Sequence, residues 1–303
     1  MPPWTPTSFF PSTKRCCPQC SQRQITVGGR KVTQYYHRAV VAHLIGFDIP
    51  VVLDIEMIRP GEGEIVAARR LFERLLPRYG RFFDAVLGDA LYFEAPLFHL
   101  CRQHGKHLVA VLKDNHPALL AEAQTLLQGE PNLVRHETQD QRVIRYWDQE
   151  GFTTDAIKDS LRVLRTEEHQ TQRERIARQW VTTQTTSTWF WATSIPQDLI
   201  PTRQLCQIGH QRWKIENRIF NALSQHWGLD HCFHHQPAAI VNFLLTLFIA
   251  HTLLACFQQR NLKDPYLRHG SLIGLASQIL IGVAAVRAGD ITWFRLGNHP
   301  PPT

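Results

Sequence analysis

Four segments between residues 84 and 127 alternate between two hydrophobic patterns, and this alternation limits the folds open to the chain. The runs at 84–88 and 108–112 are short and apolar, as in buried strands, whereas 94–103 and 117–127 have the apolar spacing of helices. A strand–helix–strand–helix order on short loops predicts a sheet with parallel members and right-handed crossovers. We therefore expect an α/β fold.

Strand patterns lie on both sides of this segment. Upstream, β-prone runs surround Gly28-Gly29, which predicts a hairpin, and a helix is expected from Glu62 to about Leu76. Between 132 and 198, short β-prone runs are separated by polar turns, and helical patterns return at 202–223, 238–259 and 272–286. These changes predict three parts: a core segment at 8–131, a β-rich insertion at 132–198, and a helical second core segment at 199–297.

A carboxylate follows the strand at 84–88, and a second one lies far along the chain in a helical pattern. These are Asp89 and Glu216, and Arg212 precedes Glu216 by one helical turn. Hard divalent cations take oxygen ligands, and two facing carboxylates can hold Mg²⁺ while substrate phosphates fill the remaining positions. The arginine adds a phosphate-directed cation on the same helical face. This pattern favours metal-dependent phosphoryl transfer.

Several motifs resemble those of the bacterial insertion-sequence DDE transposases. They are Tyr35-Tyr36-His37-Arg38, Pro60-Gly61-Glu62-Gly63-Glu64, Gly88-Asp89-Ala90-Leu91-Tyr92 and Arg212-Trp213-Lys214-Ile215-Glu216-Asn217. The resemblance extends from about residue 8 to 259 and includes the strand-rich insertion ahead of the glutamate. It implies a ribonuclease H-like core in which two aspartates and a glutamate bind Mg²⁺, for which Mn²⁺ can substitute, and cut and rejoin DNA ends.

Matched by position, Asp89 corresponds to the second aspartate of this family and Glu216 to the glutamate. Both are the expected catalytic and metal-binding residues. Arg212 matches the arginine four residues before the glutamate, and with Lys214 it is the expected contact to DNA phosphates. Gly209 and Leu223 depart from the pattern, because the family often has a phosphate-contacting tyrosine and a lysine at these positions.

The first aspartate of the family has no counterpart. It is expected a few residues before Phe9, but the first carboxylate of the sequence is Asp48. The chain therefore resembles a family member shortened at its N-terminus, and we expect it to bind DNA weakly and to cleave it poorly or not at all. Asp54, Glu56 and Asp114 are weak substitutes, since carboxylates at strand ends near loops are common.

Composition and charge agree with a DNA-binding protein of ordinary globular type. Apolar residues make up 44% and charged residues 19%, and Lys and Arg exceed Asp and Glu by 33 to 26, giving a net charge of +7. The calculated pI is about 9.2. This excess of basic residues modestly favours a polyanionic partner. We expect double-stranded DNA as the partner, in the form of terminal repeats and target, with a homodimer in the DNA complex.

The cysteines suggest a reducing compartment. Their number is odd and their spacing uneven, at positions 16, 17, 20, 101, 206, 232 and 256. No signal peptide is evident at the N-terminus, and we expect a cytoplasmic, nucleoid-associated protein.

A charge-free stretch from Ala238 to Phe257 is about as long as a membrane span. It contains Asn242, Thr246, His251 and Thr252, and no basic cluster flanks it. We predict a helix buried in the soluble core and no membrane partner. An integral membrane protein is the alternative.

Two local patterns leave their function open. Cys16-Cys17-Pro18-Gln19-Cys20 holds a CxxC motif, and a run of His and Cys residues lies at 226–235. Each could bind zinc, but neither matches a complete ligand set, so a turn and a DNA-facing loop are the plainer interpretations. Basic residues alternate with aromatics at 142–147, 178–180 and 189–191, which suits either stacking on unpaired bases or an ordinary buried sheet.

The resemblance as a whole implies transposition, in which hydrolysis frees a 3′-hydroxyl that then attacks a second phosphodiester. A non-catalytic remnant that binds DNA or a full-length transposase is the competing interpretation.

Overall fold

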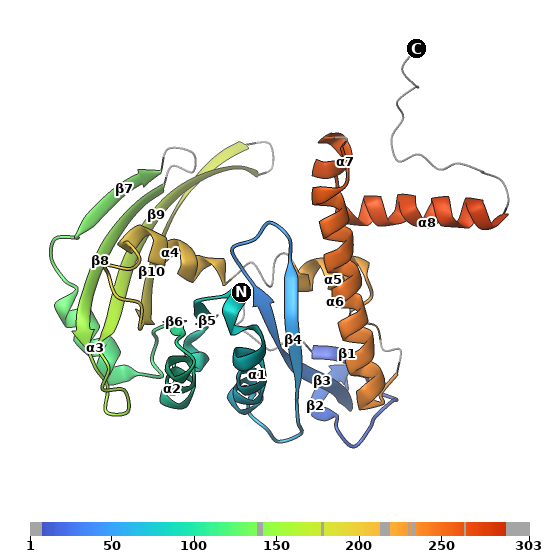
Figure 1. Ribbon diagram of the computed structural model, residues 1–303, viewed down its shortest axis with the longest axis horizontal. Coiled ribbons are helices and arrows are strands. Elements are labelled where there is room, and N and C mark those ends of the chain that lie inside the picture. The colour runs from blue at the N-terminus through green and yellow to red at the C-terminus, as the bar shows by residue number, and fades with distance from the viewer. Residues whose placement is uncertain are drawn as a thin grey trace, which may run out of the picture. The chain divides into compact units, whose positions relative to one another are not determined.

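The computed structural model describes residues 8–137, 142–176, 179–212, 219–229, 231, 234–263 and 265–288. The chain divides into two compact units. Unit 1 combines Met1–Leu71 with Lys214–Thr303, and unit 2 is the continuous segment Phe72–Trp213. Both contain helices and strands (Figure 1), so the α/β class is confirmed.

Unit 1 is built on a four-stranded antiparallel sheet. Its strands are β1 (Ser8–Ser12), β2 (Ser21–Val27), β3 (Arg30–Leu44) and β4 (Val51–Ile58). The long strand β3 pairs with all three others, with β2 along its first half and β4 along its second. The predicted hairpin turn at Gly28-Gly29 is confirmed. Both glycines have positive φ, 56° and 78°, which the favoured two-residue hairpin turn requires.

The helices of unit 1 come mainly from the C-terminal part of the chain. They are α5 (Asn221–His226), α6 (Pro237–Arg260), α7 (Pro265–His269) and α8 (Leu272–Ala288). Helix α6 packs against β4, and its residues Leu244 and Phe248 share a hydrophobic core with Phe9 and Phe10 of β1 and Ile55 of β4. The core therefore joins the two ends of the sequence.

Helix α6 covers the stretch for which the sequence predicts a buried helix. The helix is confirmed, but burial on several sides is wrong. One face, with Leu244 and His251, is buried, whereas Ile249 is 60% and Leu253 63% exposed. The helix is long and apolar enough to cross a membrane, a property that core helices of soluble proteins share. The exposed face is mixed, with the polar Asn242 and Thr246 beside the apolar Ile249 and Leu253.

Helix α1 (Glu64–Tyr79) begins in unit 1 and continues into unit 2. The spacing of Ile65, Ala68, Leu71, Phe72 and Leu75 predicts one apolar stripe, and the last four of these residues are buried whereas Ile65 is half-buried. Glu64 lies in its first turn, where a negative charge offsets the partial positive charge of the helix N-terminus.

Unit 2 contains a six-stranded mixed sheet in the order β5-β6-β10-β9-β8-β7. The strands are β5 (Ala85–Gly88), β6 (His107–Val111), β7 (Leu133–Glu137), β8 (Arg142–Phe152), β9 (Leu161–Ile176) and β10 (Gln179–Thr193). Strands β5 and β6 are parallel, as the strand–helix alternation predicts, and all other pairs are antiparallel. The expected insertion strands thus extend the sheet that begins with β5 and β6.

Helices and short 3-10 turns connect and cover this sheet. They are η1 (Gly80–Phe82), η2 (Ala90–Tyr92), α2 (Ala95–Gln103), α3 (Pro117–Leu126) and α4 (Thr202–Gln211). Leu205 and Cys206 of α4 pack on Val109, Leu164 and Trp191, from three different strands. Figure 1 shows α4 lying across the curved ribbons β8 to β10.

A buried ion pair ties the loop before α4 to this sheet. Arg162 of β9 and Asp148 of β8 are almost completely inaccessible, and Arg162 Nε donates to Asp148 Oδ1 at 2.8 Å. Arg162 also donates to the carbonyls of Pro196 and Ile200 at 3.2 and 2.7 Å. Both buried charges have partners, so Arg162 can hold the loop before α4 against the sheet without leaving a buried charge unpaired.

Candidate functional site

Asp89 lies directly after β5, where the sequence predicts a catalytic carboxylate. Strand β5 runs parallel to β6, with Gly88 opposite Ala110. Asp89 caps the η2 turn, and its Oδ1 accepts a hydrogen bond from the Leu91 N–H at 3.0 Å. In α/β sheets, ligands bind outside the carboxyl ends of parallel strands, so Asp89 stands at an edge suited to binding.

The turn after β5 explains the Gly88-Asp89-Ala90-Leu91-Tyr92 motif. A Cβ at position 88 would lie 2.4 Å from the Tyr92 Cβ, so only glycine fits beside the folded-back tyrosine. Because position 88 has no side chain, Tyr92 can fold back against the backbone there, and this sharp turn carries Asp89.

The loop after β6 is bonded to the turn after β5. Asn115 Nδ2 donates to the Ala90 carbonyl at 2.6 Å, and the His116 ring is hydrogen-bonded to the Phe93 carbonyl. Asp114 lies in this loop and is exposed. The two loops that leave the parallel strands therefore form one edge, with Asp89 and Asp114 on neighbouring segments.

Arg212 caps the C-terminal end of α4, and its backbone N–H donates to the Gly209 carbonyl at 3.4 Å. Gly209, where the family often has a tyrosine, is in close contact with Trp191. A Cβ there would lie 2.5 Å from the indole Nε1. The space beside α4 is thus filled by an aromatic ring from β10 instead of a side chain at 209.

Glu216 and Lys214 lie outside the described residues. The predicted helix at 202–223 is described as α4 and α5, and the residues between 212 and 219 are not part of the description. The proximity of Asp89 and Glu216 therefore remains a prediction. Leu223, where the family often has a lysine, is completely buried in the unit 1 core, so it presents nothing to a DNA backbone.

Glu56 of β4 has a structural partner. Arg70 of α1 donates to Glu56 Oε1 at 3.0 Å and makes two hydrogen bonds to the carboxylate of Glu62, one of them at 3.0 Å to Oε2. The hydrogen bonds from Arg70 lower the pKa of Glu62, which outweighs the opposing effect of burial. Asp54 Oδ1 accepts from the Ile55 N–H at 2.8 Å. These contacts favour the interpretation of Glu56 and Asp54 as ordinary strand carboxylates.

The basic and aromatic residues of the predicted insertion are mostly engaged within unit 2. Arg142 pairs with Glu168 and Arg145 with Glu167. Tyr146, Trp147 and Trp191 are buried, whereas Trp180 is 60% exposed. The alternation of basic and aromatic residues is thus mostly that of a buried sheet. Arg178 lies outside the described residues.

Two groups of side chains among the described residues could hold a metal ion. The first, here called the Cys/His cluster, consists of Cys17, Cys20, His37 and His235. The second consists of Glu168, Cys206 and His210. The sequence indicated Cys17 and Cys20 through the CxxC motif and His235 through the run at 226–235, but it gave no reason to join the two patterns or to add His37. His235 is buried, so at this residue the expected DNA-facing loop is wrong.

Burial sets the protonation of the Cys/His cluster. It lowers the pKa of His37 to about 4, with a further contribution from the neighbouring His235, and it raises the pKa of Cys20 to about 11. The imidazoles are therefore neutral at pH 7 and can act as ligands, while Cys20 carries its proton in the absence of a compensating cation.

The fold and the strand-end aspartate define a mixed α/β protein with a carboxylate at the C-terminal edge of its parallel strands. A family comparison identifies it further: the chain belongs to the transposase DDE domain family, whose profile matches residues 15–253. No curated protein matched the chain. Family membership indicates a transposase-type function, DNA as a partner in general, and use of a divalent metal.

Proposed function

We propose that this chain is an insertion-sequence transposase in which Asp89 and Glu216 are the catalytic, metal-binding carboxylates. The observation that carries the proposal is the position of Asp89 at the carboxyl end of β5, parallel to β6, within the segment matched by the family. Its carboxylate oxygens are hard donors of the type that Mg²⁺ and Mn²⁺ prefer.

The proposed activity is cleavage of one DNA strand followed by attack of the freed 3′-hydroxyl on another phosphodiester. A bound divalent cation would activate the attacking water and stabilise both the attacking and leaving oxygens. Asp89 would be oriented for this by the hydrogen bond from Leu91, which occupies Oδ1. Arg212 and Lys214 would neutralise phosphate charge close to the glutamate.

The finer fold assignment belongs to the same proposal. In this proposal, the parallel β5–β6 pair of unit 2 belongs to a ribonuclease H-like core. In this proposal, residues 8–131 and 199–297 supply the core and 132–198 the β-rich insertion. Terminal-repeat binding, a homodimer in the DNA complex and a nucleoid location follow from the same function.

A second candidate is DNA binding without cleavage. It requires only the basic balance of the sequence, with 33 Lys and Arg against 26 Asp and Glu, and no complete set of metal ligands. With one ligand fewer, both metal affinity and the geometry of in-line attack would suffer.

A cleavage assay distinguishes the two. End-labelled duplexes from the DNA flanking the gene are incubated with Mg²⁺ or Mn²⁺ and either this chain or a version preceded by an aspartate-bearing strand. We expect little cleavage by the first and robust cleavage by the second, abolished by Asp89→Asn and by Glu216→Gln. Glu122→Gln is the matched control, because Glu122 is an exposed carboxylate on α3 that is not part of the proposed site.

Each outcome decides something. Robust cleavage by both proteins, lost with Asp89→Asn, would show that no first aspartate is needed. Binding without cleavage by either protein would favour the second candidate. Cleavage that survives both Asp89→Asn and Glu216→Gln would overturn the assignment of the site.

A further inference from the structure

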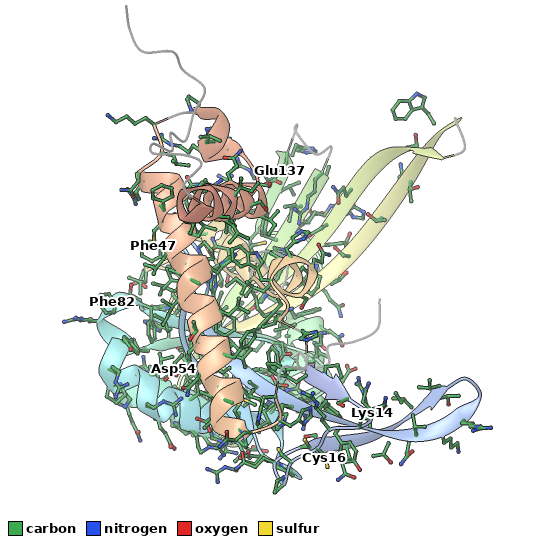
Figure 2. All side chains as sticks on the ribbon, turned by 90° about the vertical axis from the view of Figure 1, so that its right-hand side faces the viewer. Lys14, Cys16, Phe47, Asp54, Phe82 and Glu137 are labelled. Carbon is green, nitrogen blue, oxygen red and sulfur yellow. The ribbon has the colours of Figure 1, made fainter. Side chains whose placement is uncertain are left out.

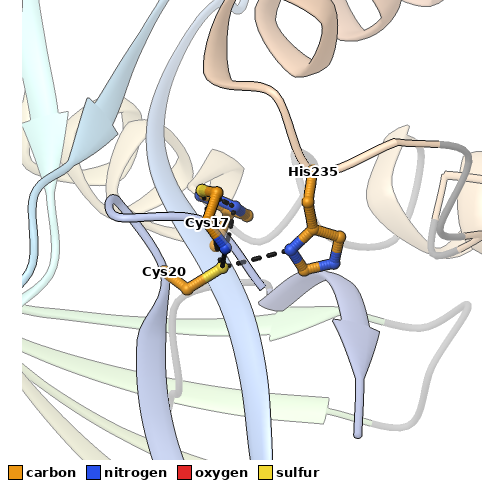
Figure 3. A group of neighbouring side chains, drawn as sticks. Cys17, Cys20 and His235 are labelled. Carbon is orange, nitrogen blue, oxygen red and sulfur yellow. Dashed lines mark hydrogen bonds between the residues drawn. The ribbon is translucent and has the colours of Figure 1, made fainter. Parts of the chain in front are cut away.

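The Cys/His cluster gathers four donor atoms from distant parts of the sequence. Cys17 and Cys20 lie in the turn before β2, His37 is in β3, and His235 lies just before α6. Figure 3 shows Cys17, Cys20 and His235 pointing toward one another. The ligand atoms of all four residues lie within 4.8 Å of one another.

The spacing of these atoms matches a small tetrahedron. The two sulfurs are 3.6 Å apart, and His37 Nε2 lies 3.5 Å from Cys17 Sγ and 3.4 Å from Cys20 Sγ. Cys20 Sγ is 3.1 Å from His235 Nδ1. A tetrahedral Zn²⁺ with bonds of about 2.3 Å to sulfur and about 2.05 Å to nitrogen requires edges of about 3.8 Å between sulfurs and about 3.6 Å between sulfur and nitrogen. The observed edges are close to this size.

The surroundings of the donors also fit a metal site. Nε2 of His235 is hydrogen-bonded at 3.1 Å to the Phe10 carbonyl, so the ring turns Nδ1 toward the cluster. Outer hydrogen bonds of this kind orient histidine ligands and fix their tautomer. The Cys17 N–H points at Cys20 Sγ at 3.2 Å, which would stabilise a thiolate. Cys20, His37 and His235 are buried, so water competes little for the ion.

We propose that the Cys/His cluster is a structural Zn²⁺ site that joins the N-terminal sheet to the segment leading into α6. Two thiolates and two imidazoles form a closed tetrahedral set, which leaves no position for a substrate. The site uses none of the carboxylates of the proposed transposase function and stands independently of it.

The second donor group serves as a contrast. Glu168 already pairs with Arg142 and accepts from His210 Nε2 at 2.8 Å, so its charge is compensated inside the protein. An arginine against the carboxylate opposes a cation, and we assign no metal there.

The first test uses the full-length protein purified without chelator. Metal analysis should find one Zn²⁺ per chain, and replacement by Co²⁺ should give the intense visible absorption of tetrahedral thiolate-bound cobalt. Alkylation should spare Cys17 and Cys20 while the metal is bound and modify Cys16. Cys16, labelled in Figure 2, is exposed, so it is an internal control.

The second test compares matched variants. Cys20→Ser and His235→Asn should each weaken zinc binding by more than the roughly 10–100-fold that loss of an outer hydrogen-bond partner costs. Cys16→Ser and His226→Asn should keep the metal, because both residues are exposed and lie outside the cluster. The melting temperature should fall only in the first pair.

Three results would overturn the proposal. The first is a wild-type protein that takes up neither Zn²⁺ nor Co²⁺. The second is a Cys17–Cys20 disulfide in freshly alkylated protein. The third is a Cys20→Ser variant that keeps its full metal content. If the ligand variants do not fold, the cobalt spectrum and the alkylation pattern of the wild type still decide the question.

Discussion

In this chain, the space beside position 209 of α4 is occupied by the indole ring of Trp191 from β10. The indole Nε1, Cε2 and Cδ1 atoms would all lie within 2.9 Å of a Cβ at this position. A tyrosine here, as the family often has, would require the ring to leave. The departure from the family pattern thus has a packing cause that the sequence alone does not reveal.

We predict that Gly209→Ala destabilises the protein. Alanine adds about 1 kcal/mol of helix propensity over glycine, but forcing a methyl group into a filled site costs about 1–3 kcal/mol. We expect a net loss of up to about 2 kcal/mol in the free energy of unfolding, measured by urea denaturation. Trp191→Phe should reduce the penalty in a double variant. An equal penalty in both backgrounds would contradict the steric cause.

Glu62 gives a second prediction at this scale, on the dependence of stability on pH. Its pKa is lowered in the folded state by hydrogen bonds from Arg70, so its contribution is present above the unfolded pKa of about 4.3 and is lost as the pH falls through the folded value. We expect Glu62→Gln to lower stability by about 1–2 kcal/mol at pH 7, since the pair is partly solvent-screened, and to have a progressively smaller effect as the pH falls below about 4.3.

Chemical denaturation across this pH range measures the effect. Glu73→Gln on the exposed side of α1 is the matched control and should leave the profile unchanged. A Glu62→Gln curve that runs parallel to the wild type at all pH values would show that the Arg70 pair contributes nothing that titrates.

Among the elements, helix α6 combines a buried and an exposed face of similar apolar character. Leu244 is completely buried in the unit 1 core, and Leu253 is 63% exposed. We predict that Leu244→Ala costs about 2–5 kcal/mol of unfolding free energy, whereas Leu253→Ala changes it by less than about 0.5 kcal/mol. Similar losses in both variants would mean that the outer face of α6 is covered in solution.

The elements also show where sequence patterns suffice. Residues 84–127 follow their predicted strand–helix alternation, because short apolar strands and amphipathic helices leave distinct periods. The pattern fails in β9 and β10, which are much longer than their predicted apolar pieces. The polar stretch from Thr182 to Thr186 in β10 is exposed on both faces, so no alternation marks it.

The candidate sites divide in the same way. Asp89 was predictable because it ends an apolar strand, and the structure places it there. The Cys/His cluster was not, since its members belong to a turn, a strand and a loop whose meeting depends on tertiary packing. A CxxC motif indicates half of a ligand set, and the histidines that complete it have no characteristic spacing from it.

At the scale of the whole molecule, the net charge of +7 predicts how DNA binding depends on salt. Each phosphate neutralised contributes about −0.9 to the slope of log K against log salt concentration. We expect weak binding with a clearly negative slope. Fluorescence anisotropy of labelled DNA, titrated at KCl concentrations of roughly 50 to 300 mM, measures this slope.

A duplex with uncharged methylphosphonate linkages is the control for this titration and should bind far more weakly. A slope near zero on ordinary DNA would contradict phosphate-driven binding and would weaken the case for a nucleic-acid partner.

The positions of the Cys/His cluster residues in the sequence affect how the site assembles while the protein is being synthesised. The first three members of the cluster are close in sequence, but 215 positions separate Cys20 from His235. At about 5–20 residues per second, the ribosome releases the early members about 10–40 s before the last one. During that interval the nascent chain carries two neighbouring thiols and one imidazole without the residue that closes the set. Oxidation competes with metal capture in this window, so the yield of correctly assembled protein should depend on the zinc supply during synthesis more than after it.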